Sequence, residues 1–456
     1  MGNKKYFSLL LLLFASLSSN AQTKTWTLEE CVRYALDNNI SIKQTELDSK
    51  SALIDEKDAL GNFLPTANAS ASHSWNIGLN QDITTGLLQN KTTQFTSAGA
   101  SVGIDIYNGL QNQNTLRRAK LSMVLAKYQL VKMQEDIALN VANAFLQVLF
   151  NKENLKVQKE QMGINQKQLA RSQELVNAGT IPRGDLLDIR ATLATDNQNV
   201  IAAENNLLIS KLSLAQLLQL DDFQNFDVVD DGMMKDENAI LAQNPTAIYD
   251  KAKEQRTELK IAQANLEIAE KNLAIAKGGL QPTLRGFYNF NTRISYADVA
   301  LRDGNGAVIG VQSAPPFFDQ FNDNKGQSYG AQLNIPIFNG FSAKNNVERS
   351  KVSLEKSKLA LEQQNLDLER NVYTAFTDAK GALNSHESAL VALESRQESY
   401  NYAKEKFNVG LMNSFDLNQS QTLLSNAQSE VLRSKYDYIF KIKILEFYFG
   451  IPIIKN

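Results

Sequence analysis

The feature that most constrains this 456-residue chain is an internal repeat. The segment IYNGL at 106–110 returns as IFNGF at 337–341, an offset of 231 residues (109 to 340). The same offset carries Gly179 onto Gly410 and Asp185 onto Asp416 without a gap. A register kept over so long a stretch indicates a duplicated unit, so the fold must be built from two related halves.

Each of these glycine-containing segments is followed by a long run with two apolar heptad series. In the second copy the series are Val347, Leu354, Leu361, Leu368, Ala375, Ala382 and Ala389, and Val352, Leu359, Leu366 and Tyr373. In the first copy they are Leu116, Met123, Leu130, Ile137 and Ala144, and Leu121, Tyr128 and Ala142. Apolar residues seven apart predict supercoiled helices. Because the two series lie roughly 200° apart around the helix, we expect a packed neighbour on each flank.

Proline is absent from Pro65 to Pro182 and from Pro336 to Pro452. Proline breaks helix interiors, so these intervals permit helices with a rise on the order of 100 Å. A coiled-coil rod is the alternative that the helices alone leave open.

The first 21 residues have the pattern of a secretory signal peptide. Lys4 and Lys5 precede a short apolar core, and Ala21 ends a small-residue cleavage site. No cysteine follows this site, so a lipid anchor is not expected. No later segment has the ~20 continuous apolar residues of a membrane helix. We therefore expect an exported protein in which any membrane span consists of strands.

Composition argues against several classes of function. The net charge of −2 does not suit nucleic-acid binding. One cysteine, Cys31, excludes an internal disulfide framework, and two histidines, His73 and His386, supply little metal or acid–base chemistry. No nucleotide-binding loop is present. We expect neither an enzyme nor a cofactor.

Two segments, about 66–107 and 283–338, alternate apolar and polar residues and predict a β-hairpin each. Such alternation is typical of strands with one lipid-facing and one lumen-facing side, although a half-buried soluble hairpin would look similar. Polar loops are expected at about 81–95 and 297–325. Gly61 and Pro65 match Gly278 and Pro282 at an offset of 217 (61 to 278), so the 14 residues by which the offsets differ are expected in the second loop.

One chain thus offers four strands, which cannot close a barrel. Open strand edges are not tolerated in lipid, so the edges must pair with other copies. Three chains would give twelve strands, an even number within the observed range.

Each long run ends in a short tip around a glycine, at about 179–185 and 410–416, and a returning helix follows. Glycine after a helix favours a left-handed cap, and Asp185 and Asp416 suit an N-cap or first-turn position. We divide the mature chain into a first repeat at 22–220, an acidic connector at 221–245, expected on the surface, and a second repeat at 246–456.

These features resemble the TolC-like outer membrane efflux proteins. The resemblance rests on the opening TLEECVRYAL at 27–36, the NGF turn at 339–341 and the tip with Val409, Gly410, Asp416 and Leu417, and it covers essentially the whole mature chain. It implies an α+β membrane protein: a homotrimer with a twelve-stranded outer-membrane β-barrel, four strands per chain, continuous with a long periplasmic α-helical barrel. It also implies strand-to-helix turns at Asn108, Gly109, Asn339 and Gly340.

In that family the hairpin tips dock a periplasmic adaptor, and carboxylates on the inner hairpins narrow the tunnel. By resemblance, Asp416 is the first of these carboxylates, whereas the second position holds Gln419. The first copy has Asp185 and Asp188 at the same spacing. The residues expected at the docking tips are Gly179, Asp185, Asp188, Gly410 and Leu411.

The function that these observations favour is an exit duct for efflux or secretion across the outer membrane. Its expected partners are two further copies, a periplasmic adaptor, an inner-membrane transporter of RND, ABC or MFS type, and outer-membrane lipid. The alternative is a soluble periplasmic coiled-coil scaffold or adaptor, which would leave the four alternating strands unexplained.

Overall fold

The structure, a computed structural model, describes residues 25–82, 86–220, 225–230 and 240–453, so the expected signal peptide at 1–21 lies outside the described residues. The chain divides into two compact units. We call Met1–Asp48, Lys127–Ile261 and Glu362–Asn456 the helical unit, and Ser49–Ala126 and Ala262–Leu361 the sheet unit. Each unit takes segments from both sequence repeats, so the compact units do not coincide with the repeats at 22–220 and 246–456.

The helices reproduce the two sequence offsets residue by residue. The bounds of α2 (Leu28–Asn38) and α3 (Ile40–Gly61) recur 217 residues later as α6 (Pro245–Gln255) and α7 (Thr257–Gly278). The 67-residue α4 (Gln111–Asn177) and the 36-residue α5 (Arg183–Leu218) recur 231 residues later as α9 (Ser342–Asn408) and α10 (Ser414–Phe449). The uninterrupted helices predicted from the absence of proline are therefore present, and the duplication extends to the helix ends.

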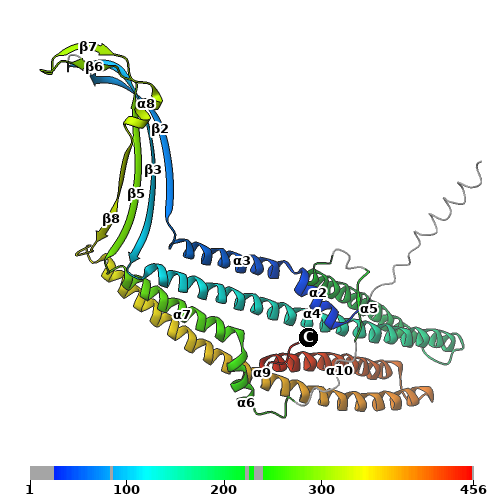
Figure 1. The fold of residues 1–456 in the computed structure, drawn as a ribbon. Helices are drawn as coiled ribbons and strands as arrows, with labels where there is room; N and C mark the ends of the chain where they lie inside the picture. Colours follow the sequence, from blue (N-terminus) through cyan, green and yellow to red (C-terminus); the bar gives the residue numbers. More distant parts are fainter. Residues whose placement is uncertain (1–24, 83–85, 221–224, 231–239, 454–456) are drawn as a thin grey trace, which may run out of the picture. The chain divides into compact units, whose positions relative to one another are not determined.

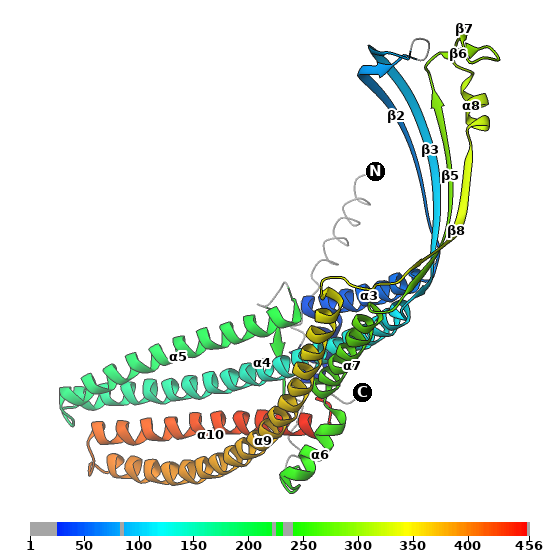
Figure 2. The same cartoon turned by 90° about the vertical axis from the view of Figure 1, so that its left-hand side faces the viewer.

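In the helical unit, α4 and α5 form one antiparallel hairpin, and α9 and α10 form the other (Figure 2). The predicted capping box opens α2, because the Glu30 backbone N–H donates to Thr27 Oγ1 at 3.3 Å and Thr27 N–H donates to Glu30 Oε2 at 3.0 Å. The largest buried side chains of the main core include Phe145, Leu214 and Leu218.

The acidic connector was expected on the surface, and its described part is anchored instead. Residues Asp227–Val228 form β4, which pairs in parallel with β1 (Thr25–Trp26). Val228 is fully buried, and the Asp227 carboxylate accepts Lys152 Nζ at 2.7 Å. Lys211 Nζ lies 3.1 Å from the other carboxylate oxygen. Apolar neighbours and two lysines therefore fix a segment that its acidic sequence alone suggested was solvated.

In the sheet unit, β2 (Thr66–Gln81), β3 (Leu88–Asn108), β5 (Thr283–Ser295) and β8 (Gly326–Asn334) form one antiparallel sheet in the order β2-β3-β5-β8 (Figure 1). The two hairpins share one register. Ala71 lies opposite Ala98, and the residues at the corresponding offsets, Tyr288 and Tyr329, also lie opposite each other. The 14 inserted residues therefore lie between β5 and β8.

The loops differ from the sequence prediction in three respects. The first loop does not extend over 81–95, because β3 begins at Leu88 and Lys91 Nζ pairs with the Asp82 carboxylate at 3.1 Å across the turn. The second loop holds a small hairpin of β6 (Val299–Arg302) and β7 (Val308–Gln312) and a helix, α8 (Phe317–Asp323). The last strand ends at Asn334 rather than near 338, since Pro336 has no N–H to donate.

The side chain of Gln320 explains why α8 lies against β5 (Figure 1). This buried amide accepts Ser295 N–H at 2.9 Å and donates to the carbonyls of Ser295 and Pro315 at 2.9 and 2.8 Å. Within the described ranges, no helix combines the length and the apolar composition that a membrane crossing requires.

Candidate functional site at the hairpin tips

The two hairpin tips are built by the same backbone motif. At the end of α4, Gly179 N–H donates to Val176 O at 3.0 Å and Thr180 N–H donates to Leu175 O at 2.9 Å. At the end of α9, Gly410 N–H donates to Phe407 O at 3.1 Å and Leu411 N–H to Lys406 O at 2.8 Å. Gly179 and Gly410 have φ of +72° and +78°. This pair of bonds satisfies the last carbonyls of each helix and requires a left-handed residue, which is why both tips carry glycine.

The returning helices start differently in the two copies. Asn413 caps α10, because its Oδ1 accepts Asp416 N–H at 2.8 Å. Pro182 precedes α5 without a side-chain cap. Asp185 and Asp416 both lie in the first helical turn, so of the two positions expected for them the structure has the first turn and not the N-cap. Their carboxylates lie at the end of the helix where the dipole favours negative charge.

Most of the predicted site residues at the tips are exposed. In the second hairpin, Asp416 and Gln419 are three residues apart and share a helix face with no opposing side chain of high burial. In the first hairpin, Asp188 is exposed and Asp185 is partly buried. Gly179, Gly410 and Leu411 are also exposed, and the Leu411 side chain is 79% accessible. The tips therefore present glycine backbone, one large apolar side chain and carboxylates to their surroundings.

Polar side chains connect the two hairpins close to the tips. Arg171 on α4 donates to the Asn408 amide oxygen on α9 at 2.9 Å. Asn418 on α10 donates to Thr192 Oγ1 on α5 at 3.4 Å. The hairpins are thus held near their tips by neutral or singly charged hydrogen bonds rather than by a close-packed apolar core.

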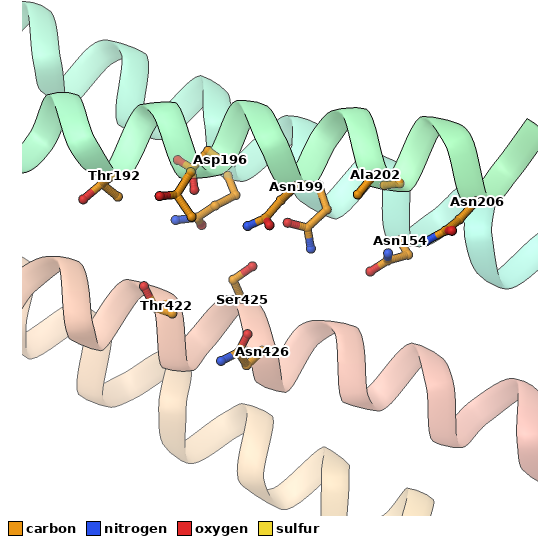
Figure 3. Close-up of a pocket in the computed structure, with 13 residues that line it drawn as sticks. Asn154, Thr192, Asp196, Asn199, Ala202, Asn206, Thr422, Ser425 and Asn426 are labelled. Atoms are coloured by element: carbon orange, nitrogen blue, oxygen red, sulfur yellow. The ribbon is translucent and has the colours of Figure 1, made fainter.

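A polar cavity of about 460 Å³ lies between the hairpins farther from the tips (Figure 3). Asp196 and Asn199 of α5 face Ser425 and Asn426 of α10 across it. Asp196 accepts a hydrogen bond from Asn165 Nδ2. Burial raises the pKa of Asp196 above its usual value, and the bond from Asn165 opposes this shift. Sequence analysis missed this cavity, and the only signal for it was the run of Asn, Gln, Ser and Thr residues on helix faces that were otherwise apolar.

The strand-to-helix turns contain the four predicted residues and one more in each copy. Gly109 and Leu110 have φ of +59° and +58°, and Gly340 and Phe341 have φ of +64° and +65°. Asn339 Oδ1 accepts Ala343 N–H at 3.3 Å, and Asn108 Oδ1 accepts Gln111 Nε2 at 3.1 Å. Two successive left-handed residues redirect the chain from strand to helix. The second is not glycine, so the NG motif alone did not indicate it.

The family model for outer membrane efflux proteins matches residues 32–219 and 248–443. The chain belongs to the outer membrane efflux protein family. It is 22% identical to the outer membrane protein TolC of Escherichia coli K12, over 96% of this chain and 84% of the relative. It is also 22% identical to the TolC of Vibrio cholerae, over 95% of this chain and 93% of that protein.

Solved channel structures share the fold of this outer membrane efflux protein. The Campylobacter jejuni CmeC outer membrane channel aligns with a TM-score of 0.76 at 18% identity, covering 93% of this chain and 85% of that one. The open-state Neisseria gonorrhoeae MtrE outer membrane channel aligns with a TM-score of 0.71 at 14% identity, covering 95% and 92%. The TolC-like fold expected from the sequence is therefore confirmed, and the family is one of transport ducts rather than enzymes.

In this efflux protein, Asp196→Asn is expected to stabilise the helical unit near neutral pH. A buried carboxylate whose pKa is raised makes the fold less stable as the pH rises through that pKa, because the folded state then has to hold the charge. A neutral amide can donate to Asn165 Oδ1, which lacks a partner among the described residues. We expect a gain of about 1 kcal/mol, measured as the urea midpoint at pH 7.

The gain from Asp196→Asn should shrink as the pH is lowered, because the wild-type carboxyl then becomes protonated. Asp188→Asn, an exposed carboxylate on the same helix, serves as the matched control and should shift the midpoint little. An equal gain at pH 4 and pH 7 would contradict the assignment of the effect to the buried charge.

Proposed function

We propose that this protein is the outer-membrane exit duct of an efflux or secretion system. In this proposal three copies supply twelve strands to one barrel in the outer membrane and twelve long helices to a periplasmic tunnel. The duct is passive, and an inner-membrane transporter of RND, ABC or MFS type drives export through a periplasmic adaptor. The family membership and the fold shared with solved outer-membrane channels support this proposal.

The observation that carries the proposal is the four-stranded sheet with two free edges and an apolar face. Among the described residues, β2 and β8 each pair on one side only. Trp75, Ile77 and Leu79 on β2 share one face and are exposed, as are Tyr329 and Leu333 on β8. A sheet with an apolar face and open edges suits lipid only if further strands close it.

We further propose roles for the tips. Three copies of Asp416 would form a ring at the periplasmic entrance of the tunnel, with Gln419 one turn farther along the helix. A ring of carboxylates attracts cations and narrows a pore. The exposed tips with Gly179, Asp185 and Asp188, and with Gly410 and Leu411, would dock the adaptor, because flat glycine turns let another helical hairpin approach closely.

Two measurements on detergent-solubilised protein test the proposed function. Native mass spectrometry is expected to give a trimer, and protein inserted into a planar lipid bilayer is expected to give discrete single-channel conductance. A water-soluble monomer without conductance would overturn the proposal and would favour the soluble scaffold.

Asp416→Asn is expected to weaken block of the reconstituted channel by a trivalent cation about ten-fold when the cation is added from the periplasmic side. The reason is that three converging carboxylates concentrate cations far more strongly than isolated surface charges do. Asp188→Asn removes an exposed carboxylate of the other hairpin and serves as the control. An unchanged blocking concentration for Asp416→Asn would remove this residue from the constriction.

A further inference from the structure

The chain contains one complete seam between its two repeats. On the sheet, β3 of the first repeat pairs with β5 of the second. On the helices that continue these strands, Arg118 of α4 donates to the Asn272 side chain of α7 at 3.3 Å. The counterparts of these elements at the offsets 231 and 217 are β8 and α9, and β2 and α3. These counterparts lie at opposite edges of the sheet and do not pair with each other within the chain.

We propose that β8 and α9 of one copy bind β2 and α3 of a second copy, in the register that β3 and α4 keep with β5 and α7. The inference rests on the proposed trimeric duct and adds to it the residue-by-residue contacts of the subunit boundary. The occupant of the free edges is thus a second copy of this chain, because its own repeat supplies the complementary surface.

The internal seam fixes the register of the strands. Ala98 lies opposite Thr292 in β3 and β5. The two offsets convert this pair into Tyr329 of one copy opposite Trp75 of the second. Directly opposite residues share a face, and this register keeps the apolar residues of β8 on the same side as those of β2. A slip of one residue would put apolar side chains opposite polar ones, whereas a slip of two would break the correspondence with the internal seam.

Two glycines show the closest approach along the internal seam. A Cβ on Gly109 would lie 2.2 Å from Gly278 O, and a Cβ on Gly278 would lie 2.4 Å from Gly109 O. The counterparts Gly340 and Gly61 have no atom of this chain within 4 Å of such a Cβ. The single chain gives no steric reason for glycine at Gly61, whose φ is not positive. A backbone of the second copy at the distance seen internally supplies that reason.

Side chains that pair inside the chain have counterparts that would pair across the boundary. Tyr107 donates a hydrogen bond to Gln281. Its counterparts are Phe338 and Leu64, which are 76% and 62% exposed and would form an apolar contact. The Arg118–Asn272 hydrogen bond corresponds to Arg349 and Asp55, which would form an ion pair. Each internal polar pair is thus matched by a pair that is again chemically complementary.

The heptad series of α9 fits the same boundary. Val352 and Leu366 are 57% and 56% exposed, whereas their counterparts on α4, Leu121 and Glu135, are partly buried. Glu135 accepts Thr257 Oγ1 at 3.2 Å, and the offsets convert this contact into Leu366 facing Ile40, whose exposure is 54%. The second apolar seam, predicted from the sequence to have its own neighbour, is therefore uncovered in one copy of the repeat only.

Disulfide trapping tests the register in a Cys31→Ala background. Tyr329→Cys is combined in turn with His73→Cys, Trp75→Cys or Ile77→Cys, and Arg349→Cys with Asp55→Cys or Asp48→Cys. Opposite Cβ atoms in a sheet are about 5 Å apart and diagonal ones about 7–8 Å. Trimers that cross-link at least about five-fold more through Trp75 and Asp55 than through the displaced positions support the proposal. Preferential cross-linking at a displaced position in a trimer would overturn the register and leave the duct function intact.

Gly61→Ala tests the backbone contact independently of cysteine chemistry. Within one chain this change should be harmless or mildly stabilising, because helices favour alanine over glycine. At the proposed boundary it should raise the protein concentration needed for trimers about ten-fold or more, since overpacked contacts are costly. Gly163→Ala, an open glycine in the middle of α4, is the control. An unaffected trimer in Gly61→Ala would refute the contact, whereas a wild-type protein that never forms trimers would refute the duct itself.

Discussion

Replacing Arg256 by alanine is expected to lower the free energy of unfolding of the helical unit by about 3–5 kcal/mol. Arg256 follows α6 and is 4% exposed. Its guanidinium donates to Glu135 at 3.1 Å and to both carboxylate oxygens of Glu258 at 2.9 and 3.0 Å. It also lies 3.8 Å from the centre of the Phe447 ring. Removing it leaves two partly buried carboxylates without their cation and an aromatic face without its partner.

The loss in the Arg256 variant should depend on pH in a defined direction. Burial raises the pKa of Glu135, and the charge of Arg256 opposes this. Burial also pushes the pKa of Glu258 upward, but the hydrogen bonds and charge of Arg256 outweigh it and hold this pKa below its ordinary 4.5. The stabilisation from Glu258 is therefore present above pH 4.5 and lost as the pH falls through the lowered pKa. Without Arg256 both carboxyls protonate more readily, so the variant should be weakest near neutral pH.

The measurement is the urea midpoint followed by far-ultraviolet circular dichroism at pH 7 and pH 5. Arg370→Ala removes an exposed ion pair with Asp367, 2.9 Å long, and should cost about 0.5 kcal/mol or less. Combining Arg256→Met with Glu135→Gln and Glu258→Gln should recover part of the loss, because no buried charge is then left unpaired. A loss for Arg256→Ala no larger than that of the surface control would show that the cluster contributes nothing.

Much of the fold could be predicted because the chain contains two versions of it. The bounds of α4 and α9 follow from proline-free heptad runs, and the offsets 217 and 231 hold for helix ends and for strand registers alike. The prediction failed where a few tertiary contacts decide. The burial of Val228, the Gln320 hydrogen bonds that hold α8 and the end of β8 before Pro336 depend on neighbours far along the chain or on a single missing donor.

The candidate site shows the same division. Gly179 and Gly410 could be placed as left-handed caps because a helix end followed by glycine has one common solution. The capping role expected for Asp416 belongs to Asn413, three residues earlier, and sequence spacing alone did not separate these two residues. The polar cavity around Asp196 was missed, because a buried carboxylate and a solvated one look alike until the facing helix is known.

The second large effect is expected for Gly109→Ala, at the turn from β3 into α4. The added Cβ would lie 2.2 Å from the Gly278 carbonyl oxygen, and φ at Gly109 is +59°. Left-handed backbone costs about 1–2 kcal/mol for a residue with a Cβ, and an overpacked contact adds about 1–3 kcal/mol. We therefore expect a loss of about 2–5 kcal/mol in the sheet unit. Fluorescence of Trp75 in a Trp26→Phe background reports the unfolding of this unit alone, because the chain has two tryptophans.

Gly340→Ala is the matched control for Gly109→Ala, since its φ of +64° is nearly the same but no atom of the chain lies within 4 Å of the added Cβ. In dissociated single chains it should cost only the backbone strain of about 1–2 kcal/mol, so the difference between the two variants isolates the contact with Gly278. In assembled trimers the two variants should become similar, because Gly61 of a second copy would then occupy the place that Gly278 occupies internally. Equal losses in single chains would contradict the close approach at Gly109, and a Gly340→Ala loss that does not grow on assembly would contradict the boundary inferred from it.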